Sequence, residues 1–323
     1  MSLYTTKTIT AEEIERAVEL LASGEVVALP TETVYGLAAD ATRPEAVVKI
    51  FEAKERPFFD PLIVHLPDLD WLDRLTRDRP PMVDLLIERF WPGPLTLVLP
   101  RREIVPDLVT AGLSTVAVRM SAHPVFQLAA SRFGKPLAAP SANRFGRISP
   151  TSAGDVLSEL GGRIPLVVDG GPTRHGLEST ILSVESGRIQ ILRSGPITPE
   201  ELGEFGEVCF GFAGATPDAP GQLKSHYAPR TPLRLMTVGS SATDSQLGRM
   251  GYLAWRQCPQ GFAGEAVRVL SPSGDLREAA ATLFAKLRQL DEMGLDLIVA
   301  EQVPETGLGI AIMDRLKKAS AQG

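Results

Sequence analysis

The first segment of the chain has the hydrophobic pattern of an amphipathic helix. Apolar residues recur at the spacing of one helix face from Ile14 to Leu21, and Gly24 follows where the pattern stops. Thr10 precedes this segment and Glu13 stands three residues later, which is the arrangement of a capping box. The sequence therefore predicts a first helix from about residue 10 to residue 24, with the Thr10–Glu13 capping box at its start.

After this helix, short apolar runs of strand length alternate with segments of helical spacing. Such alternation is typical of a sheet covered by helices, so the sequence predicts a mixed α/β layer fold. The predicted strands are residues 26–30, 34–39, 62–66, 95–99, 116–119, 137–139, 166–169, 180–184 and 189–193, and the predicted helices after the first are 45–52, 81–90, 125–133 and 153–160.

The periodic pattern stops between about residues 203 and 230, where Gly, Pro and Ala are frequent. This composition is typical of a linker. Beyond it, residues 233–238, 251–254, 267–270 and 297–300 read as strands and residues 276–293 and 310–318 as helices. We therefore expect a first domain over residues 1–203, a linker over 204–230, and a small α/β domain over 231–323.

The length and composition agree with two globular domains. The chain has 323 residues, of which 44% are hydrophobic and 22% are charged. No run approaches the roughly 18 apolar residues of a membrane span, and the first residues lack the pattern of a signal peptide. We expect a cytoplasmic protein without a membrane segment.

Charge and metal-ligating residues narrow the possible functions. Two cysteines and four scattered histidines cannot supply a disulfide framework or a Cys-rich zinc site. The net charge of −6 argues against a protein that binds nucleic acid mainly by electrostatics. Residues 131–150, however, contain four basic residues and no acidic one, so a weak local RNA contact stays open. The four are Arg132, Lys135, Arg144 and Arg147.

The common nucleotide and hydrolase motifs are absent. The sequence contains no G-x-x-x-x-G-K-[ST], no H-E-x-x-H and no G-x-S-x-G. Residues 307–312 approach G-x-G-x-x-G but lack its third glycine. P-loop and triad-hydrolase chemistry are therefore excluded as interpretations.

Short polar clusters follow the predicted strands, where open α/β sheets bind their ligands. Residues 31–33 place two hydroxyls and a carboxylate after a strand, which also fits an N-capped turn. Lys54 and Arg56 lie beside Pro57 and Pro61, and this pair suits a phosphate group or an ordinary surface charge pair. His65 ends an apolar strand and fits either a ligand contact or a core histidine.

Arg119 closes an apolar strand, and a buried cation there needs a partner. Either a carboxylate of the protein or the carboxylate of a substrate could serve. Residues 138–150 are small and polar, and such side chains let a ligand approach the backbone. Residues 177–180 and 192–196 again place polar residues at strand ends.

Taken in order, these segments resemble the YrdC-type threonylcarbamoyl-AMP synthase family, and the C-terminal segments resemble its two-domain members. The resemblance implies a twisted mixed sheet flanked by helices, plus a small Rossmann-like α/β C-terminal domain. The segments are PTETVYGLAADA, KERPFFDPLIVHL, WPGPLTLVL, STVAVRM, APSANRFGRISPT, ESTI and LRSGPI, followed by PGQLKSHYAPRTPL and GLGIAIMDRLKKAS.

The resemblance implies synthesis of L-threonylcarbamoyladenylate and pyrophosphate from L-threonine, bicarbonate and ATP. The carbamate of threonine attacks the α-phosphorus, so no enzyme nucleophile is needed. The product is passed to downstream tRNA threonylcarbamoyl transferase proteins, which modify the adenosine beside the anticodon. An RNA-binding module and a carbamoyl-transferring domain like those of hydrogenase maturation factors are the alternatives; the latter resembles the core but not the C-terminal extension.

The resemblance also implies roles for individual residues. Lys54 and Arg56 would neutralise phosphate charge, and Mg²⁺ would arrive with ATP rather than on ligands of the protein. Asp60 stands where asparagine is expected, which leaves its role open. Thr33, His65, Arg119, Ala139 and Ser179 would hold threonine or its carbamate; Arg56, Asp60, Thr115, Ser141, Asn143, Ser149 and Arg193 would surround ATP; His226 and Tyr227 would form a lid over the site.

Overall fold

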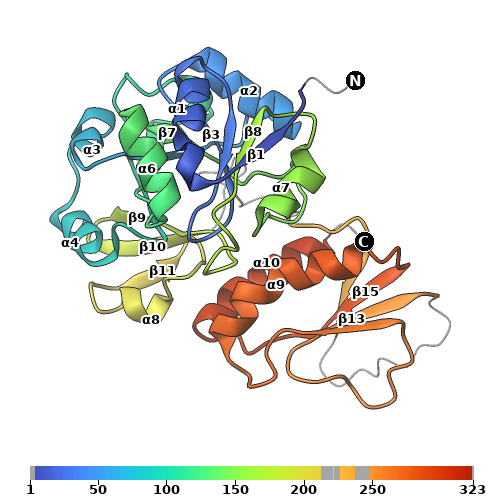
Figure 1. Cartoon of the computed structure of the whole chain (residues 1–323). Helices are drawn as coiled ribbons and strands as arrows, with labels where there is room; N and C mark the ends of the chain where they lie inside the picture. Colours follow the sequence, from blue (N-terminus) through green and yellow to red (C-terminus); the bar gives the residue numbers. More distant parts are fainter. Residues whose placement is uncertain (1–3, 212–220, 222–225, 237–247, 322–323) are drawn as a thin grey trace.

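The computed structural model describes residues 4–211, 221, 226–236 and 248–321. These residues form two α/β bodies, one ending near residue 211 and the other beginning near residue 231 (Figure 1). The predicted α/β fold with a large mixed sheet is confirmed. Parts of two predicted elements lie outside the described residues: 212–220 and 222–225 of the linker, and 237–238 of the strand predicted at 233–238.

The larger sheet has eleven strands within the described residues, in the order β1-β8-β2-β3-β7-β4-β6-β5-β9-β10-β11. Parallel and antiparallel pairs are mixed, since β4 runs parallel to β6 whereas β5 runs antiparallel to it. Its strands are β1 (Lys7–Ile9), β2 (Val27–Leu29), β3 (Gly36–Asp40), β4 (Ile63–His65), β5 (Leu95–Pro100), β6 (Thr115–Arg119), β7 (Leu137–Ala138), β8 (Leu166–Val168), β9 (Thr180–Glu185), β10 (Arg188–Arg193) and β11 (Val208–Phe210).

Helices cover both faces of this sheet. Alternate residues of a strand point to opposite faces, so one strand can pack with the helices on both sides. Val27 and Leu29 pack with the helices of one face, and Ala28 packs with those of the other. The first face carries α1 (Ile14–Ala22) and α6 (Pro124–Phe133); the second receives side chains from α2 (Pro44–Lys54), α3 (Asp70–Leu75), α4 (Pro81–Phe90), α5 (Asp107–Thr110), α7 (Ala153–Leu160) and α8 (Pro199–Leu202).

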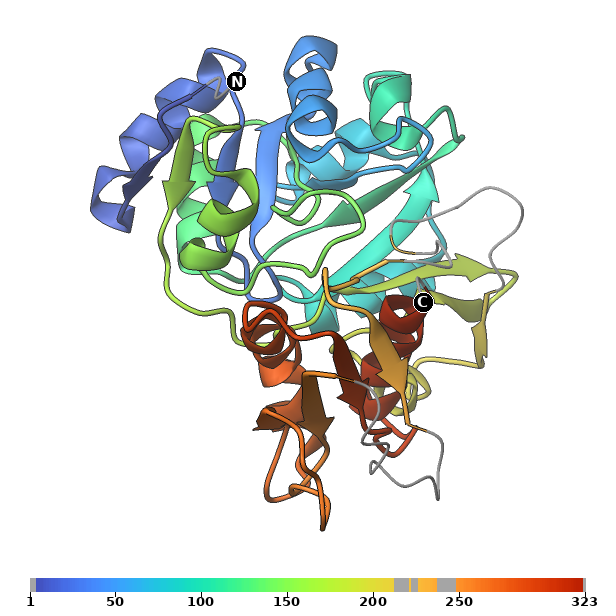
Figure 2. The same ribbon diagram turned by 90° about the vertical axis from the view of Figure 1, so that its right-hand side faces the viewer.

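The C-terminal body contains a four-stranded parallel sheet in the order β12-β15-β13-β14. Leu253 and Ile298 pack against two long helices, which lie between this sheet and the large body (Figures 1 and 2). Among the described residues, no helix has the length and apolar character needed to cross a membrane. The elements are β12 (Leu233–Leu235), β13 (Met250–Ala254), β14 (Ala266–Val269), β15 (Leu297–Ala300), α9 (Leu276–Asp291) and α10 (Leu308–Ser320).

Several details differ from the sequence-based expectations, since strand β1 and the short helices α3, α5 and α8 were not predicted. The Thr10–Glu13 capping box is wrong: a 3₁₀ turn over Ala11–Glu13 precedes α1, and the Thr10 side chain makes no capping hydrogen bond. β11 lies within the range predicted as linker, where it pairs in parallel with β10 and extends the large sheet. The domain boundary at residue 203 stays a prediction.

A buried arginine of α9 joins the two bodies. Arg288 donates to the Ile148 carbonyl at 2.9 Å and to Glu159 Oε1 at 3.2 Å, and its Nε lies 3.4 Å from Asp155 Oδ1. Asp155 and Glu159 belong to α7 of the large body. Buried charges of opposite sign that pair across an interface penalise its separation, because each would then lack its partner.

We expect Arg288→Met to lower the free energy of unfolding by about 3 kcal/mol, since Asp155 and Glu159 lose a cationic partner in a buried setting. Urea titration followed by circular dichroism measures this change. Arg16→Met is the control, because Arg16 pairs with Glu19 on the exposed surface and its loss should leave the midpoint unchanged. Equal midpoints for the two variants would contradict the prediction.

Candidate active site

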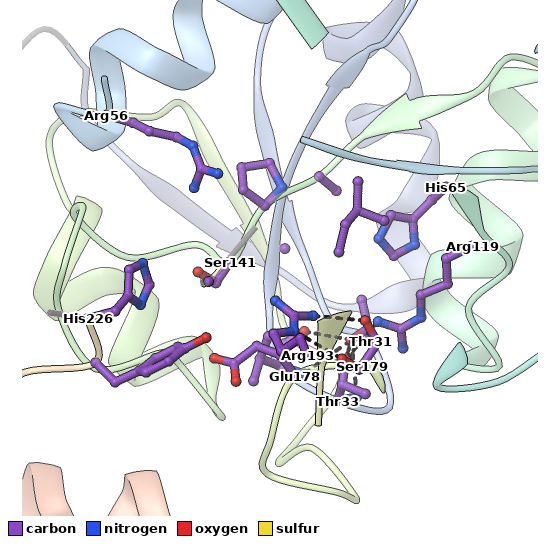
Figure 3. A pocket seen from close by; sticks show the side chains of 17 residues that line it. Thr31, Thr33, Arg56, His65, Arg119, Ser141, Glu178, Ser179, Arg193 and His226 are labelled. Carbon is purple, nitrogen blue, oxygen red and sulfur yellow. Dashed lines mark hydrogen bonds between the residues drawn. The ribbon is translucent and has the colours of Figure 1, made fainter. Parts of the chain in front are cut away.

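One cavity lies where several strands of the large sheet end (Figure 3). Arg56 and His226 lie at one end of it, His65 and Arg119 lie at the other, and Ser141 lies between them. The cavity and the solvent at its open side together contain about 540 Å³ of space free of atoms. Ten of the predicted site residues line it: Thr33, Arg56, His65, Arg119, Ala139, Ser141, Ser179, Arg193, His226 and Tyr227.

Arg119, the last residue of β6, is held by partners from other segments. One terminal nitrogen donates to Glu32 Oε1 at 2.7 Å, the other donates to Thr33 Oγ1 at 3.0 Å, and Nε donates to the Gly93 carbonyl at 3.1 Å. The Ser121 hydroxyl donates to the second oxygen of Glu32. A carboxylate of the protein therefore partners Arg119, which is one of the two alternatives that the sequence left open.

The Glu32–Arg119 pair is ionised. Burial alone would raise the pKa of Glu32, but the charge of Arg119 and the hydrogen bonds from Ser121 and Arg119 lower it to about 2. A guanidinium has five N–H donors, and the contacts to Glu32, Thr33 and Gly93 use three of them. Arg119 can therefore keep these contacts and still donate to an anionic ligand in the cavity.

His65 faces the same end of the cavity as a neutral imidazole. Its ring centre lies 4.6 Å from that of Phe126, and its Nδ1 has no hydrogen-bond partner among the described residues. Burial and the nearby charge of Arg119 lower the pKa of His65 to about 3. Near neutral pH the ring can therefore contribute a hydrogen bond to a ligand without adding charge.

Lys54, the last residue of α2, lies behind the cavity wall. Its Nζ donates to the carbonyls of Ser141 and Asn143, and its side chain is buried. Burial and the repulsion of Arg56 lower the pKa of Lys54 well below its usual value. In this structure Lys54 fixes the loop that carries Ser141, and it does not line the cavity itself.

Arg56 lines the opposite end of the cavity from Arg119 and is oriented by Asp60. Its terminal nitrogen lies 2.9 Å from Asp60 Oδ2 and donates to the Pro61 carbonyl at 2.8 Å. Burial raises the pKa of Asp60, against the attraction of Arg56 and Lys54. Asp60 is fully buried and is absent from the cavity lining, so its observed contact is with Arg56.

Two other predicted residues lie directly behind the lining. The side-chain amide of Asn143 donates to the carbonyls of Arg144 and Arg147, which shapes the loop after Ser141. The Ser149 hydroxyl donates to Glu178, a residue of the cavity wall. Asn143 therefore supports the cavity wall through the loop after Ser141, and Ser149 supports it through Glu178.

Thr115 is not brought to this cavity. It begins β6, whereas Arg119 ends it, and four residues of strand span roughly 13 Å. Thr115 instead lines a separate hollow beside Arg101 and Arg102. Thr115 and Arg119 are four residues apart, so their side chains point to the same face of the strand. The cavity, however, covers only one end of that face.

Arg193 and Ser179 form the middle of the cavity wall (Figure 3). The terminal nitrogen of Arg193 donates to Ser179 Oγ at 2.9 Å, and its Nε donates to the Ser179 carbonyl at 3.1 Å. The hydroxyls of Ser179 and Thr96 lie 2.8 Å apart. Neighbouring strands β5, β9 and β10 thus set the position of the arginine.

His226 and Tyr227 lie against the cavity although their segment was predicted as a linker. Both are buried; the His226 ring contacts the rings of Phe145 and Tyr227, at centre distances of 5.7 and 4.2 Å. Ala228 N donates to the Gly146 carbonyl at 2.8 Å. Tyr227 has φ +62°, a conformation that costs a non-glycine residue free energy and needs compensating contacts.

The sequence analysis missed two acids that complete the site. Glu32 partners Arg119, and Glu178 lines the cavity while it accepts hydrogen bonds from Ser149 and Arg315. Both stand in the polar clusters already noted, at strand ends. These acids could have been expected from the rule that every buried cation needs a partner. The sequence alone, however, does not show which acid lies nearest to each cation.

The basic run at 131–150 is largely neutralised on the folded surface. Three of its four basic residues pair with acids from other segments, which reduces the local excess of positive charge. The pairs are Arg132 with Glu15, Lys135 with Asp40, and Arg144 with Glu159.

The described residues contain no preformed cluster of metal-ligating side chains. Mg²⁺ favours oxygen ligands in octahedral geometry, and no cluster of three or more acidic, histidine or cysteine side chains is found among them. Asp60 is a single carboxylate, and it is paired with Arg56.

Comparison with known proteins matches both bodies of the chain. A family model described as "Telomere recombination", which covers the YrdC, YciO and Sua5 proteins, matches residues 19–195. A second, described as "Threonylcarbamoyl-AMP synthase, C-terminal domain", matches residues 197–321. Threonylcarbamoyl-AMP synthase of Bacillus subtilis (strain 168) is 42% identical over 325 residues, which is 95% of this chain and 93% of that protein.

Solved structures and shorter relatives extend the comparison. The crystal structure of Pyrococcus abyssi Sua5 complexed with L-threonine matches with a TM-score of 0.88 and 38% identity, over 98% of this chain and 96% of that chain. Threonylcarbamoyl-AMP synthase of Vibrio campbellii is 32% identical and is covered over its full length by 57% of this chain. The chain therefore belongs to the two-domain threonylcarbamoyl-AMP synthase family.

Proposed function

We propose that the cavity binds L-threonine at the end of His65 and Arg119 and the triphosphate of ATP at the end of Arg56. The enzyme is a threonylcarbamoyl-AMP synthase, which makes L-threonylcarbamoyladenylate and pyrophosphate from L-threonine, bicarbonate and ATP for tRNA modification. The observation that carries the assignment of sites is the separation of Arg56 and Arg119 at opposite ends of one cavity (Figure 3). One cavity can then hold the carboxylate of threonine at one end and the phosphates of ATP at the other.

The threonine end offers groups that suit an amino acid. Arg119 would donate its remaining N–H groups to the carboxylate, and Thr33 and His65 would form hydrogen bonds with the other polar groups of the substrate. Ala139 leaves room beside them because its side chain is small. Ser179 would complete this end from the neighbouring strand.

The triphosphate end offers cationic and hydroxyl groups. Arg56 and Arg193 would donate to phosphate oxygens, and Ser141 would add a hydroxyl between the two ends. Lys54 would act through the loop it holds, since its amine donates to the carbonyls of Ser141 and Asn143. Asp60, Asn143 and Ser149 would position these groups from behind. Thr115 stays a prediction as an ATP contact.

The chemistry follows from positioning and charge. The threonine amine and bicarbonate give a carbamate and water, and a carbamate oxygen then attacks the α-phosphorus of ATP and expels pyrophosphate. No nucleophile of the enzyme is required, so alignment of the two substrates and stabilisation of charge by Arg56 and Arg193 would supply catalysis. Mg²⁺ would enter as a complex with ATP and neutralise part of its triphosphate charge.

His226 and Tyr227 would act as a lid. They reach the cavity from the segment between the two bodies and cover its wall beside Arg56. Burial and the charges of Arg56 and Lys54 lower the pKa of His226 well below its usual value, so the lid adds no positive charge near neutral pH. The product would pass to a tRNA threonylcarbamoyl transferase. A weak RNA contact at residues 131–150 stays a prediction.

Pyrophosphate release from ATP and Mg²⁺ tests the function. We expect release only when both L-threonine and bicarbonate are present, because neither alone gives the attacking carbamate. Mass spectrometry of the same mixture should detect threonylcarbamoyl-AMP. Release that persists without threonine or without bicarbonate would instead indicate an ATP hydrolase.

Arg56→Met should reduce kcat/KM for ATP by roughly 10- to 150-fold, the equivalent of a lost hydrogen bond to a charged group. Pyrophosphate release at varied ATP concentration measures the effect. Arg132→Met is the matched control, because Arg132 pairs with Glu15 on the exposed surface of the same body. Wild-type kinetics in Arg56→Met would refute its contact with ATP.

Arg119→Lys should raise KM for L-threonine by at least about tenfold and leave KM for ATP within a factor of about two to three. The lysine keeps the charge beside Glu32 but lacks the planar fork that can hold Glu32 and a substrate carboxylate together. The two KM values, measured by varying each substrate in turn, separate the two ends of the cavity. An equal rise in both would contradict the proposed division.

A further inference from the structure

Arg315 belongs to α10 of the C-terminal body, yet its side chain is completely buried against the large body. Its Nε donates to Glu178 Oε2 at 2.9 Å, and a terminal nitrogen donates to the Ser194 carbonyl at 2.9 Å. Its guanidinium carbon lies 5.0 Å from the ring centre of Tyr227. Arg315 therefore contacts an acid of the cavity wall and a residue of the lid at once.

Glu178 is the acid that makes this contact important. It is the one acidic residue among those that line the cavity, and the Ser149 hydroxyl donates to its other carboxylate oxygen. An unpaired carboxylate there would repel the phosphates of ATP and the carboxylate of threonine at close range and low dielectric. The wall of a site for two anions thus contains an anion that must be neutralised.

Arg315 does not take a place in the cavity itself. It is absent from the lining, whereas Glu178, Tyr227 and Arg193 are present in it. It reaches Glu178 from behind, through the interface between the two bodies, so it cannot contact a substrate in the cavity directly.

We propose that Arg315 is a positioning residue of the synthase reaction: from the C-terminal domain it neutralises and orients Glu178, and thereby allows anionic substrates to bind. This inference rests on the proposed assignment of the cavity to ATP and threonine. It gives the C-terminal domain a direct part in the electrostatics of the catalytic site. ATP binding then depends on the docked arrangement of the two domains, since separation would expose the cavity to the uncompensated charge of Glu178.

The charge state of Glu178 supports this role. Burial favours its neutral form, but the attraction of Arg315, then of Arg193, and the hydrogen bonds from Ser149 and Arg315 lower its pKa below the usual value. Glu178 therefore carries a negative charge near neutral pH, and Arg315 is the partner bonded to it directly.

Relatives without the second domain provide a test by comparison. The Vibrio campbellii protein is covered in full by 57% of this chain, so it is too short to hold both domains and cannot supply Arg315. We expect relatives of this kind to have an uncharged residue at the position of Glu178. An acid there without a cation from another segment would contradict the proposal.

The decisive experiment compares Arg315→Met with the double variant Glu178→Gln/Arg315→Met in the full-length enzyme. Arg315→Met should raise KM for ATP by about tenfold or more, because Glu178 keeps its charge but loses the cation that is bonded to it directly. The double variant should recover most of that loss, because glutamine retains a polar side chain without the charge. A double variant with the same KM as Arg315→Met would show that Arg315 serves only the packing of the interface.

Arg288→Met in the presence and absence of Glu178→Gln is the matched control, since Arg288 is a second buried arginine that crosses the same interface. Glu178→Gln should not rescue it.

If Arg315→Met does not fold, Arg315→Lys replaces it. Lysine keeps the positive charge, so KM for ATP is expected within about threefold of wild type, and an inactive Arg315→Lys enzyme would overturn the charge argument. Absence of threonine-dependent pyrophosphate release in the wild-type enzyme would refute the proposed function, whereas unchanged ATP kinetics in Arg315→Met would refute this inference alone.

Discussion

The structure depends on the pairing of buried charges around one cavity. A charged side chain that leaves water loses several kcal/mol of hydration unless an opposite charge or hydrogen bonds replace it. Arg119 is paired with Glu32, Arg56 with Asp60, and Arg315 with Glu178, while Lys54 donates to two backbone carbonyls. These partners hold the basic side chains in fixed positions around the cavity.

Two of these pairs join residues that are distant in the sequence, which ties the site to the complete fold. Glu32 and Arg119 are 87 residues apart, and Glu178 and Arg315 are 137 residues apart and belong to different bodies. The first pair requires the strand order of the large sheet, and the second requires that the C-terminal body is docked. Local unfolding at either place would leave a buried charge without its partner, so the site and the interface stabilise each other.

Local pattern predicted most helices and strands, whereas the charge pairs required the three-dimensional arrangement. The segment of β6 was predicted because Val116, Ala117 and Val118 form an apolar run, but the position of each residue along the strand decides that Arg119 reaches the cavity and Thr115 does not. β1 and β11 are edge strands with mostly exposed side chains, whereas the equally short β2 and β4 are buried and lie in the apolar runs that predicted them. The need of Arg119 for a partner was evident from the sequence. Which carboxylate would serve was not, since Glu32 alone reads equally well as part of a capped turn.

The segment before the C-terminal body shows how composition alone can mislead. Its Gly and Pro content predicts a flexible connection, yet Tyr227 is fully buried, with a positive φ that costs free energy. The compensation comes from both sides: Tyr227 shares an apolar cluster with Ile148 and Leu177 of the large body, and Phe284 and Arg315 of the C-terminal body pack on its ring. Neither body alone supplies all of these contacts, so the conformation of Tyr227 depends on the docking of the large body and the C-terminal body. The same arginine that pairs with Glu178 packs on this ring, so one side chain of the C-terminal body contributes both to the charge of the cavity wall and to the position of Tyr227.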